Sequence, residues 1–411
     1  MKNEKRDHKK LGPQLGLFYI DQVVGKGLPM FLPKGAVIKR ELEKFIVDEE
    51  IRRGYQHVFT PDIARLALYQ KSGHYPYYQD SMYAPIEIDD EQFMLRPMTC
   101  PHHFQLYLSS PHSYRELPLR IAEVAKLYRY EQSGEIMGLQ RTRAMCLADA
   151  HIICADEEQA EQEIDSALEL IEYVTGVLGL KINEHYRYRL SLGDRADDKK
   201  YFKNDAAWAK GETLLRSLMH RRGSEFEETK GEAAFYGPKI DIQMKNINGK
   251  EDTAFTVQYD FCMPERFDLS YTNSRGARQR ALVVHRSSIG TTERIMAFLI
   301  EHYAGAFPLW LAPVQVAVLP IGEKQNFYAQ KVFAELKTND IRAEINLDNN
   351  TLGKKIRAGK EQKIPYLVIT GDEEVESGKL TVEGRQEKLE NISAANFIAR
   401  LQEEIKTKKL N

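Results

Sequence analysis

The stretch from Leu119 to Cys154 constrains the fold of this chain more than any other segment, because it predicts two strands joined by a long loop. Arg129 and Glu131 stand two residues apart on the first strand, and Asp149 and His151 stand two apart on the second. Side chains alternate across a strand, so the members of each pair point to one face of the sheet. Charged groups gathered on one face are costly to bury unless a charged ligand or a metal ion lies against them. The stretch therefore predicts a binding face.

A solvated sheet face with surface ion pairs is the alternative interpretation, because structural ion-pair networks also gather opposite charges. The second strand, however, continues with Ile152 and Ile153, and several alanines and leucines surround them. This apolar content indicates a half-buried sheet and favours the binding face.

The pattern of predicted elements changes near Pro308, and a chain of 411 residues is too long for one ordinary core. Before this point strands occur in clusters with helices between them, and the residues after Lys181 predict alternating strands and polar connectors. This order favours an α+β domain with an antiparallel sheet. After Pro308 strands and helices alternate, which predicts a small α/β domain with a mostly parallel sheet. We therefore expect two domains, over residues 1–307 and 308–411.

Charge and cysteine usage restrict the partners and the compartment. The formal net charge is −2, so any contact with nucleic acid must come from a local patch. The four cysteines form no C-x-x-C pair, and so few in a chain of this length are typical of a reducing compartment. The N-terminal residues lack the apolar run of a signal peptide, and no stretch approaches the roughly 20 apolar residues of a membrane span. These features predict a cytoplasmic protein without a membrane anchor.

Cys100, His151 and His285 form a candidate metal site, because each lies on or beside a predicted strand of the first domain. Three nitrogen and sulfur ligands with a fourth position left open describe a functional zinc site. Each residue also has an ordinary interpretation, as a small buried cysteine or as a core histidine. The three lie far apart in the sequence, so their spacing does not decide between these interpretations.

Six motifs, in order along the chain, resemble the catalytic core of the threonyl-tRNA synthetase family of class II enzymes. They are RPMTCPHH, LYRYEQSGE, ADAHII, AAFYGPKIDI, VVHRSSIGTTER and PLWLAPVQV. The resemblance extends from about Arg6 to about Lys406. It implies a class II catalytic domain followed by an anticodon-binding domain, ATP-dependent activation of L-threonine, and transfer to the 3′ end of tRNA(Thr). It also implies a homodimer across the long helix in the region Lys34–Pro61.

The resemblance implies that Cys100, His151 and His285 hold one zinc ion per subunit, which the amino and hydroxyl groups of threonine complete. Asp149 would accept a hydrogen bond from the same hydroxyl. Valine lacks this group, and a site built to bind a hydroxyl rejects an analogue without it far more strongly than an apolar pocket does. Further substrate-binding residues implied by the family are Met98, Tyr236 and Gln258.

The ATP contacts follow from the same resemblance, and Mg²⁺ would accompany the nucleotide. Arg129 would hold the α-phosphate and the threonine carboxylate, and so neutralise charge that develops during the reaction. Glu131 would contact the adenine amino group, and Arg141 the terminal phosphates. Arg294 would stack on adenine, although a helix-surface arginine is its ordinary interpretation. Lys239 would meet the phosphoryl or carbonyl oxygens.

The tRNA contacts involve both predicted domains. His74 matches a family histidine that assists transfer, and a surface-loop histidine is the alternative. The family places the anticodon against Asn349 and Glu374, and Arg357 belongs to a basic run at helical spacing over Leu352–Lys363. Side chains of this kind read unpaired RNA bases, although such a run alone is usually a solvated helix face.

Several positions depart from the usual family pattern, in the adenine pocket and at the anticodon. They are Met145, Leu147, Ala148, Asp252, Thr253 and Glu383. The chain also begins where the catalytic core of longer family members begins, without their N-terminal and editing domains. We expect such a protein to attach serine as well, because serine keeps the hydroxyl and lacks one methyl group, a difference worth roughly 1–3 kcal/mol.

Two further functions remain as alternatives. A synthetase-like paralogue would form an aminoacyl adenylate and transfer it to an acceptor other than tRNA; the altered pocket favours this function, and the retained anticodon-like domain argues against it. A non-catalytic tRNA-binding or regulatory protein would not need Arg129, Arg294 or the three metal ligands. Charging of tRNA at its 3′ end distinguishes these functions.

Overall fold

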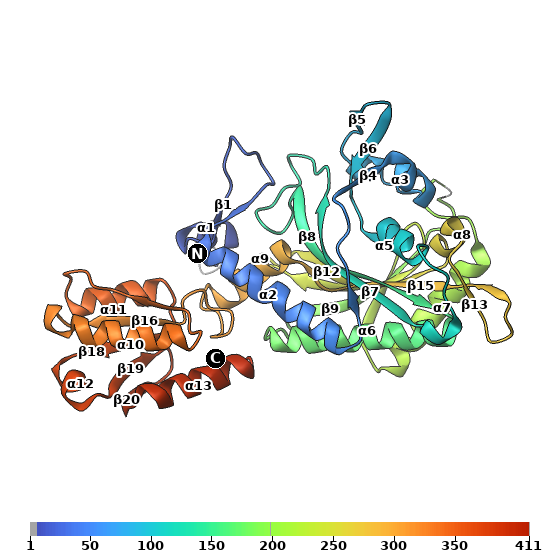
Figure 1. Ribbon diagram of the computed structural model, residues 1–411. Coiled ribbons are helices and arrows are strands. Elements are labelled where there is room, and N and C mark those ends of the chain that lie inside the picture. The colour runs from blue at the N-terminus through green and yellow to red at the C-terminus, as the bar shows by residue number, and fades with distance from the viewer. Residues whose placement is uncertain (1–5, 198, 411) are drawn as a thin grey trace. The chain divides into compact units, whose positions relative to one another are not determined.

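The computed structural model describes residues 6–197 and 199–410, which form two compact units (Figure 1). The large unit comprises residues 20–29 and 43–297, and the small unit comprises the described residues of 1–19, 30–42 and 298–411. The domain boundary expected after residue 307 stays a prediction. No helix among the described residues is long and apolar enough to cross a membrane.

An eight-stranded sheet forms the centre of the large unit, counted over the described residues, in the order β10-β9-β11-β12-β15-β8-β7-β3. The pairs β10–β9 and β3–β7 at its two ends are parallel, and the strands between them pair antiparallel. The expected antiparallel α+β fold is therefore confirmed. The strands are β3 (Gln56–His57), β7 (Leu119–Tyr128), β8 (Ala144–Cys154), β9 (Tyr186–Leu192), β10 (Phe226–Lys230), β11 (Lys239–Lys245), β12 (Glu251–Asp260) and β15 (Leu282–Thr291).

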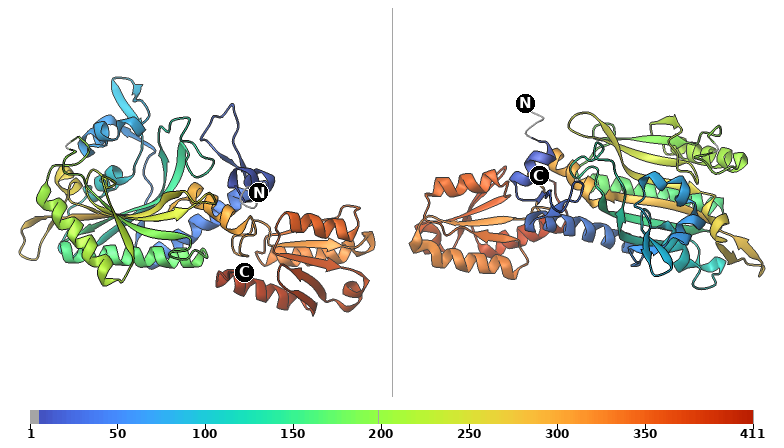
Figure 2. Two further views of the ribbon diagram at one scale, coloured as in Figure 1. Left: turned by 180° about the vertical axis from the view of Figure 1, so that it is seen from behind. Right: turned by 90° about the horizontal axis from the view of Figure 1, so that it is seen from above.

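Helices cover both faces of this sheet (Figures 1 and 2). The helix α6 (Glu157–Val177) runs along one face, and it begins where the Asp156 carboxylate accepts a hydrogen bond from the Gln159 backbone N–H at 2.9 Å. Its buried side chains recur at helical spacing, as expected for an amphipathic helix. The helix α5 (Cys100–Tyr107) lies on the opposite face and brings Cys100 to the sheet.

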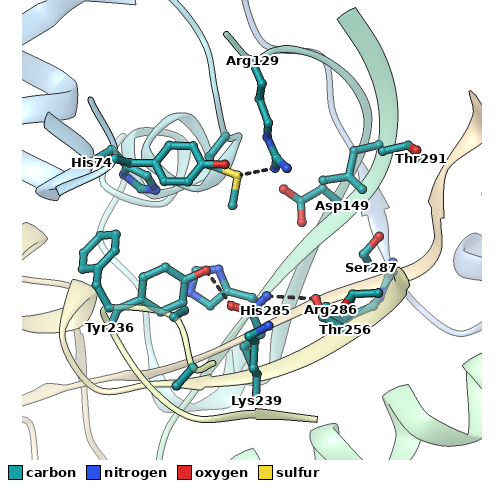
Figure 3. A pocket seen from close by; sticks show the side chains of 18 of the residues that line it. His74, Arg129, Asp149, Tyr236, Lys239, Thr256, His285, Arg286, Ser287 and Thr291 are labelled. Carbon is teal, nitrogen blue, oxygen red and sulfur yellow. Dashed lines mark hydrogen bonds between the residues drawn. The ribbon is translucent and has the colours of Figure 1, made fainter. Parts of the chain in front are cut away.

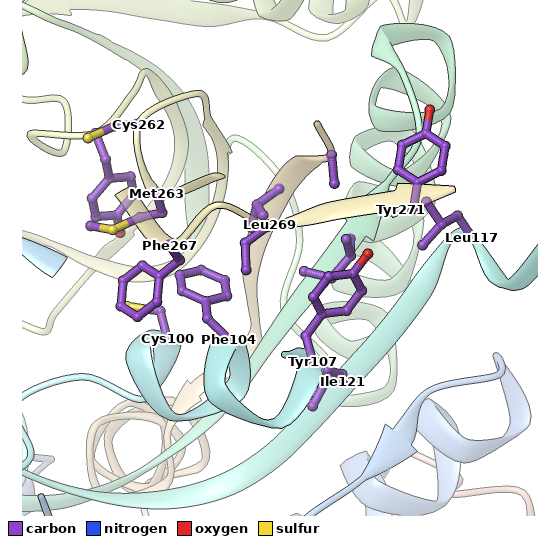
Figure 4. Packing of buried hydrophobic residues seen from close by; sticks show 14 residues of the cluster. Cys100, Phe104, Tyr107, Leu117, Ile121, Cys262, Met263, Phe267, Leu269 and Tyr271 are labelled. Carbon is purple, nitrogen blue, oxygen red and sulfur yellow. The ribbon is translucent and has the colours of Figure 1, made fainter. Parts of the chain in front are cut away.

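An apolar cluster fixes α5 in place (Figure 4). Phe104 is fully buried, and its ring lies 5.2 Å from that of Phe267 in α8 (Met263–Phe267). Burying aromatic side chains of this size contributes several kcal/mol, because each removes a large apolar area from water. The position of Cys100 at the start of α5 therefore depends on the packing of Phe104 one turn later.

The helix α7 (Asp205–Arg221) lies in the region where the sequence predicted only strands and polar connectors, and that prediction was wrong. Asn204 caps the helix by accepting a hydrogen bond from the Ala207 backbone N–H at 3.1 Å. The buried residues Trp208, Leu215 and Met219 share one helical face, but the many charged residues between them obscured the periodicity.

The small unit contains a five-stranded sheet, counted over the described residues, in the order β17-β16-β18-β19-β20. Alternate residues of β16 pack on opposite faces: Val316 and Val318 face α10 and α13, and Ala317 and Leu319 face α11 (Figure 2). The elements are β16 (Val316–Pro320), β17 (Ala343–Ile345), β18 (Tyr366–Thr370), β19 (Leu380–Gly384), β20 (Lys388–Ile392), α10 (Asn326–Thr338), α11 (Leu352–Glu361), α12 (Asp372–Ser377) and α13 (Ala394–Lys406).

The expected small α/β domain is confirmed, but its sheet is mixed and not mostly parallel. The strand β16 pairs parallel with β17 and β18, whereas β18–β19 and β19–β20 are antiparallel. A parallel crossover needs about a dozen or more connecting residues, and the segment between β18 and β19, residues 371–379, is shorter. The chain therefore returns antiparallel.

The remaining helices and strands are short, apart from two longer helices. They are α1 (His8–Gln14), α2 (Pro33–Arg52), α3 (Leu66–Ser72), α4 (His74–Tyr77), α9 (Thr292–Tyr303), β1 (Phe18–Tyr19), β2 (Met30–Phe31), β4 (Ile63–Arg65), β5 (Ile86–Ile88), β6 (Glu91–Leu95), β13 (Ser270–Thr272) and β14 (Arg278–Arg280).

Candidate active site

A cavity of about 390 Å³ opens over the central strands of the large unit (Figure 3). In this view His74 and Tyr236 lie on one side of the cavity, and Asp149 and Thr291 on the other. Most of the residues that the sequence predicted for threonine and ATP line it. They are His74, Met98, Arg129, Asp149, His151, Tyr236, Lys239, Gln258, His285 and Arg294.

Strand register brings four of these residues into one row. His151 on β8 lies directly opposite His285 on β15, His285 opposite Gln258 on β12, and Gln258 opposite Lys239 on β11. Residues paired in this way project from the same face of a sheet. The row therefore crosses the floor of the cavity, although its members are far apart in the sequence.

Cys100, His151 and His285 meet at one end of the row. Their ligand atoms all lie within 4.8 Å of one another, and all three residues are buried. The Nδ1 of His151 lies 2.8 Å from Nδ1 of His103, and the Nε2 of His285 lies 2.7 Å from a carboxylate oxygen of Asp260. One ring nitrogen of each histidine is thus held, and the other is left for a ligand. Two imidazoles and a thiol in this arrangement fit a zinc ion.

His74 lies beside this cluster. Its Nε2 is 3.7 Å from Sγ of Cys100, and its Nδ1 is 2.8 Å from the Ser72 hydroxyl. Burial, with the nearby charges of His285, Arg266 and Arg129, lowers the pKa of His74 to about 3. The predicted surface-loop alternative is therefore wrong, since His74 is a buried neutral imidazole at the cavity.

Further polar side chains lie around the cluster. The Tyr236 ring stacks on His285 at 4.8 Å, and its hydroxyl donates to Oε1 of Gln258 at 2.6 Å. Asp149 is buried on β8 two residues before His151, and burial raises the pKa of its carboxyl. Met98 lies at the edge of this region, with its sulfur 3.1 Å from the Arg129 guanidinium.

Arginines mark the other end of the cavity. The Nε of Arg129 is buried and has no hydrogen-bond partner among the described residues. Arg294 is held by backbone carbonyls, with Nε 2.9 Å from the Gln140 oxygen and Nη1 bonded to the Thr253 oxygen. Burial, together with the Arg129 charge, lowers the pKa of Arg294. An unpaired buried cationic donor requires an anion to compensate it.

Three predicted charged residues already have protein partners. Arg141 donates to the Glu131 carboxylate at 2.6 Å on the loop between β7 and β8. Lys239 lies 2.8 and 2.9 Å from the two oxygens of Asp241. Lys239 lines the cavity, whereas Glu131 and Arg141 are not among its lining residues.

The departures from the family pattern differ in their position. Met145 and Leu147 alternate with Asp149 along β8 and line the cavity, so they give this part of its wall an apolar surface. Ala148 faces the other side of the sheet and does not line the cavity. One carboxylate oxygen of Asp252 is buried and has no hydrogen-bond partner in the described part of the chain.

The residues predicted to contact the anticodon belong to the small unit. Asn349 is exposed in the loop before α11, and Arg357 is exposed on α11 with Nε 2.9 Å from Glu361. Glu374 accepts hydrogen bonds at 2.7 Å from the Gly371 backbone and from the Thr381 hydroxyl.

His103 and Asp260 contact the metal-ligand cluster, but the sequence analysis did not select them. Both had a detectable signal. His103 follows Cys100 by three residues, the spacing of neighbours on one helix face, and Asp260 follows Gln258 by two, the spacing of one strand face.

Two domain families match the sequence. A tRNA synthetase class II core domain (G, H, P, S and T) matches residues 83–303, and an anticodon binding domain matches residues 315–404. A threonine–tRNA ligase from Geobacillus sp. (strain WCH70) is 47% identical over 98% of this chain. The match covers 62% of that relative, so the chain spans less than two thirds of its length.

Solved structures share the whole architecture. The crystal structure described as the RNA binding domain of threonyl-tRNA synthetase from Cryptosporidium parvum Iowa II is 32% identical, with a TM-score of 0.90, and the match covers 97% of this chain and 98% of that one. A putative threonyl-tRNA synthetase from Aeropyrum pernix is 28% identical, with a TM-score of 0.84, over 98% of this chain and 96% of that one.

Proposed function

This chain belongs to the threonyl-tRNA synthetase family of class II enzymes, and we propose that it activates L-threonine with ATP and transfers it to the 3′ end of tRNA(Thr). The observation that carries this proposal is one cavity lined by His151 and His285 of the candidate metal cluster and by Arg129, whose Nε has no hydrogen-bond partner among the described residues. Such a cavity accommodates an amino acid whose carboxylate points toward a phosphate.

The proposed first step joins the threonine carboxylate to the α-phosphorus of ATP and releases pyrophosphate. Arg129 binds both reacting groups and neutralises the negative charge that develops on the phosphoryl oxygens. Arg294, fixed by two backbone carbonyls, stacks on the adenine, and Met145 and Leu147 line the same cavity. Mg²⁺ accompanies ATP, Glu131 contacts the adenine amino group, and Arg141 and Lys239 exchange their ion pairs for phosphate oxygens. Catalysis then rests mainly on positioning and electrostatics.

Threonine selection rests on the metal-ligand cluster. Cys100, His151 and His285 would hold one zinc ion per subunit, and the bound ion would supply coordination positions for the amino and hydroxyl groups of threonine. Asp149 accepts a hydrogen bond from the hydroxyl, and Tyr236 with Gln258 closes the wall of the cavity. Valine has no hydroxyl to satisfy these groups, whereas serine has one.

The tRNA contacts involve both units. His74, a neutral imidazole, assists the attack of the terminal ribose hydroxyl on the adenylate. Asn349, Arg357 and Glu374 present polar groups of the small unit to the anticodon bases. Glu383, one of the departures from the family pattern, lies 2.5 Å from Lys360 and pairs with that lysine of the basic run.

A homodimer is the proposed assembly, in the cytoplasm. The reason is two large apolar side chains left exposed, Ile51 near the end of α2 at 54% and Phe59 just after β3 at 94%. Large exposed apolar side chains are typical of a surface that a second subunit covers. We expect Phe59→Asp to convert the dimer to a monomer in light scattering after gel filtration, and an unchanged mass would contradict this surface. The four cysteines, all in the described part of the chain, form no disulfide, which agrees with a reducing compartment.

The decisive experiment is aminoacylation of tRNA(Thr) with threonine, serine or valine, together with pyrophosphate exchange for the first step. We expect charging with threonine, weaker charging with serine and none with valine. Cys100→Ser should abolish zinc content and both activities, whereas the matched control Cys154→Ser changes an equally buried cysteine away from the cavity. Exchange without tRNA charging would instead support the paralogue with another acceptor, and activity with valine would contradict zinc-based selection.

A further inference from the structure

We propose that His103 and Glu123 are positioning residues that fix which ring nitrogen of His151 is available to a metal ion. The inference rests on the proposed zinc site and deepens it. Neither residue contacts the cavity, and both act through His151.

The three residues form a buried chain of hydrogen bonds. The Nδ1 of His151 lies 2.8 Å from Nδ1 of His103, and the Nε2 of His103 lies 3.3 Å from a carboxylate oxygen of Glu123. His103 belongs to α5 and Glu123 to β7, so the chain links the helix that carries Cys100 to the sheet that carries His151. All three side chains are at most 2% exposed, so water does not compete for these bonds.

Glu123 is the fixed end of this chain because its carboxylate stays ionised. Burial alone would raise its pKa, but hydrogen bonds from His103 and Thr60 and the charge of Arg96 lower it to about 2. The Arg96 guanidinium lies 3.1 Å from one carboxylate oxygen, and the Thr60 hydroxyl donates to the other at 2.7 Å. An ionised carboxylate accepts hydrogen bonds and donates none.

The ionised Glu123 carboxylate decides which atom donates and which accepts in each of these hydrogen bonds. His103 must donate its Nε2–H to the carboxylate, so in the neutral ring its Nδ1 is an acceptor. His151 must then donate its Nδ1–H to His103, and the lone pair of His151 lies on Nε2. A metal ion binds the unprotonated nitrogen, so these hydrogen bonds leave Nε2 of His151 as the ligand atom.

The second histidine ligand is held more directly. Asp260 accepts from Nε2 of His285 at 2.7 Å, and its other oxygen accepts the backbone N–H groups of Cys262 and Met263 at 2.8 and 2.9 Å. His285 is left with its Nδ1 lone pair. The two ligands therefore present opposite ring nitrogens, and only His151 depends on an intermediate histidine.

A purely structural role for His103 is the alternative, because its ring also packs edge-on against His151, with centroids 4.8 Å apart. The two roles differ in what a substitution does. Loss of packing would destabilise the unit without changing metal preference, whereas loss of the acceptor leaves the Nδ1–H of His151 buried and unpaired and frees its ring to change tautomer.

The test compares His103→Leu, which removes the acceptor, with His103→Asn, whose amide oxygen can accept from His151. His102→Leu is the matched control, since His102 is also buried but bonds the Tyr69 hydroxyl at 2.9 Å and is not part of the hydrogen bonds that link Glu123 to His151. Zinc affinity is measured by competition with a chromophoric chelator, and Co²⁺ absorption reports the ligand geometry. We expect His103→Leu to weaken zinc binding by about 10–100-fold and to change the Co²⁺ spectrum, with partial recovery in His103→Asn and no change in His102→Leu.

Wild-type affinity in His103→Leu, or an equal loss in His102→Leu, would overturn the proposal. Tautomers read by ¹⁵N NMR of histidine-labelled, zinc-free protein test it independently, since His151 should be protonated at Nδ1 in the wild type. A wild-type chain that binds no zinc would refute the zinc part of the proposed function, while the tautomer measurement would still decide the role of His103. Protonation at Nε2 of His151 would overturn the inference whatever the metal result.

Discussion

Replacement of Glu123 by glutamine should remove a pH-dependent part of the stability of the large unit. The hydrogen bonds and the Arg96 charge described above lower the pKa of Glu123 from 4.5 to about 2, although burial opposes this. Each pKa unit is worth roughly 1.4 kcal/mol, so the ionised carboxylate contributes about 3 kcal/mol at neutral pH. Because the pKa is lowered on folding, this contribution is complete above pH 4.5 and disappears as the pH falls toward 2.

Glutamine imitates the protonated carboxyl, so the variant should be about 3 kcal/mol less stable than the wild type at pH 7 and only about 1 kcal/mol less stable at pH 3. Arg96, His103 and Thr60 bond the Glu123 carboxylate, Asp149 lies opposite Glu123 on β8, and all four are unchanged in the variant.

The chain contains two tryptophans, which allows the large unit to be followed alone. Trp208 is buried in the large unit, and Trp310 belongs to the small unit. Urea unfolding followed by fluorescence in a Trp310→Phe background therefore reports the large unit, where two-state analysis of the whole chain would fail. A difference between wild type and Glu123→Gln that stays constant from pH 7 to pH 3 would refute the argument.

Three further predictions concern packing and positioning. Phe104→Ala should destabilise the large unit by about 3–5 kcal/mol in the same urea assay, because it leaves a cavity under α5. In Gly237→Ala the new Cβ would lie 1.9 Å from the Tyr259 carbonyl oxygen, so pyrophosphate exchange should fall by about 100-fold, while Gly134→Ala, which meets no heavy atom within 4 Å, should change it less than about twofold. Arg294→Lys cannot donate to both backbone carbonyls as the planar guanidinium does. It should raise the KM for ATP by about tenfold in that exchange assay.

Local periodicity made part of the fold predictable. The hairpin of β7 and β8 agrees with the expected strand pair, and Asp149 and His151 share one face of β8. Arg129 and Glu131 lie beyond the end of β7 at Tyr128, so their expected place on the first strand was wrong. Asp156 caps α6, as its position before the amphipathic run indicated. These signals involve neighbouring residues, so they can be detected in the sequence without knowledge of the tertiary structure. The antiparallel return of β19 was missed because it depends on the length of one connection and not on any pattern within the strands.

The candidate metal cluster could be proposed from the sequence only with help from the family resemblance. His151 and His285 meet because β8 and β15 pair in one register across more than a hundred residues of intervening chain, and Cys100 reaches them from a separate element, the start of α5. No spacing rule encodes such a meeting. The proposed positioning role of His103 was harder still to predict, because it depends on the buried carboxylate of Glu123.

The row of His151, His285, Gln258 and Lys239 bears on how chains of this kind can vary in length over evolution. Deletion of one residue within β15, before His285, would turn that histidine to the face covered by α6. The candidate metal site would then lose one of its three ligand residues, even if the sheet still formed. The segments that join these strands have no such restriction, and one of them already carries α6, β9 and α7 between β8 and β11. We expect insertions and deletions among homologous chains to gather in the connections and to be rare inside these four strands.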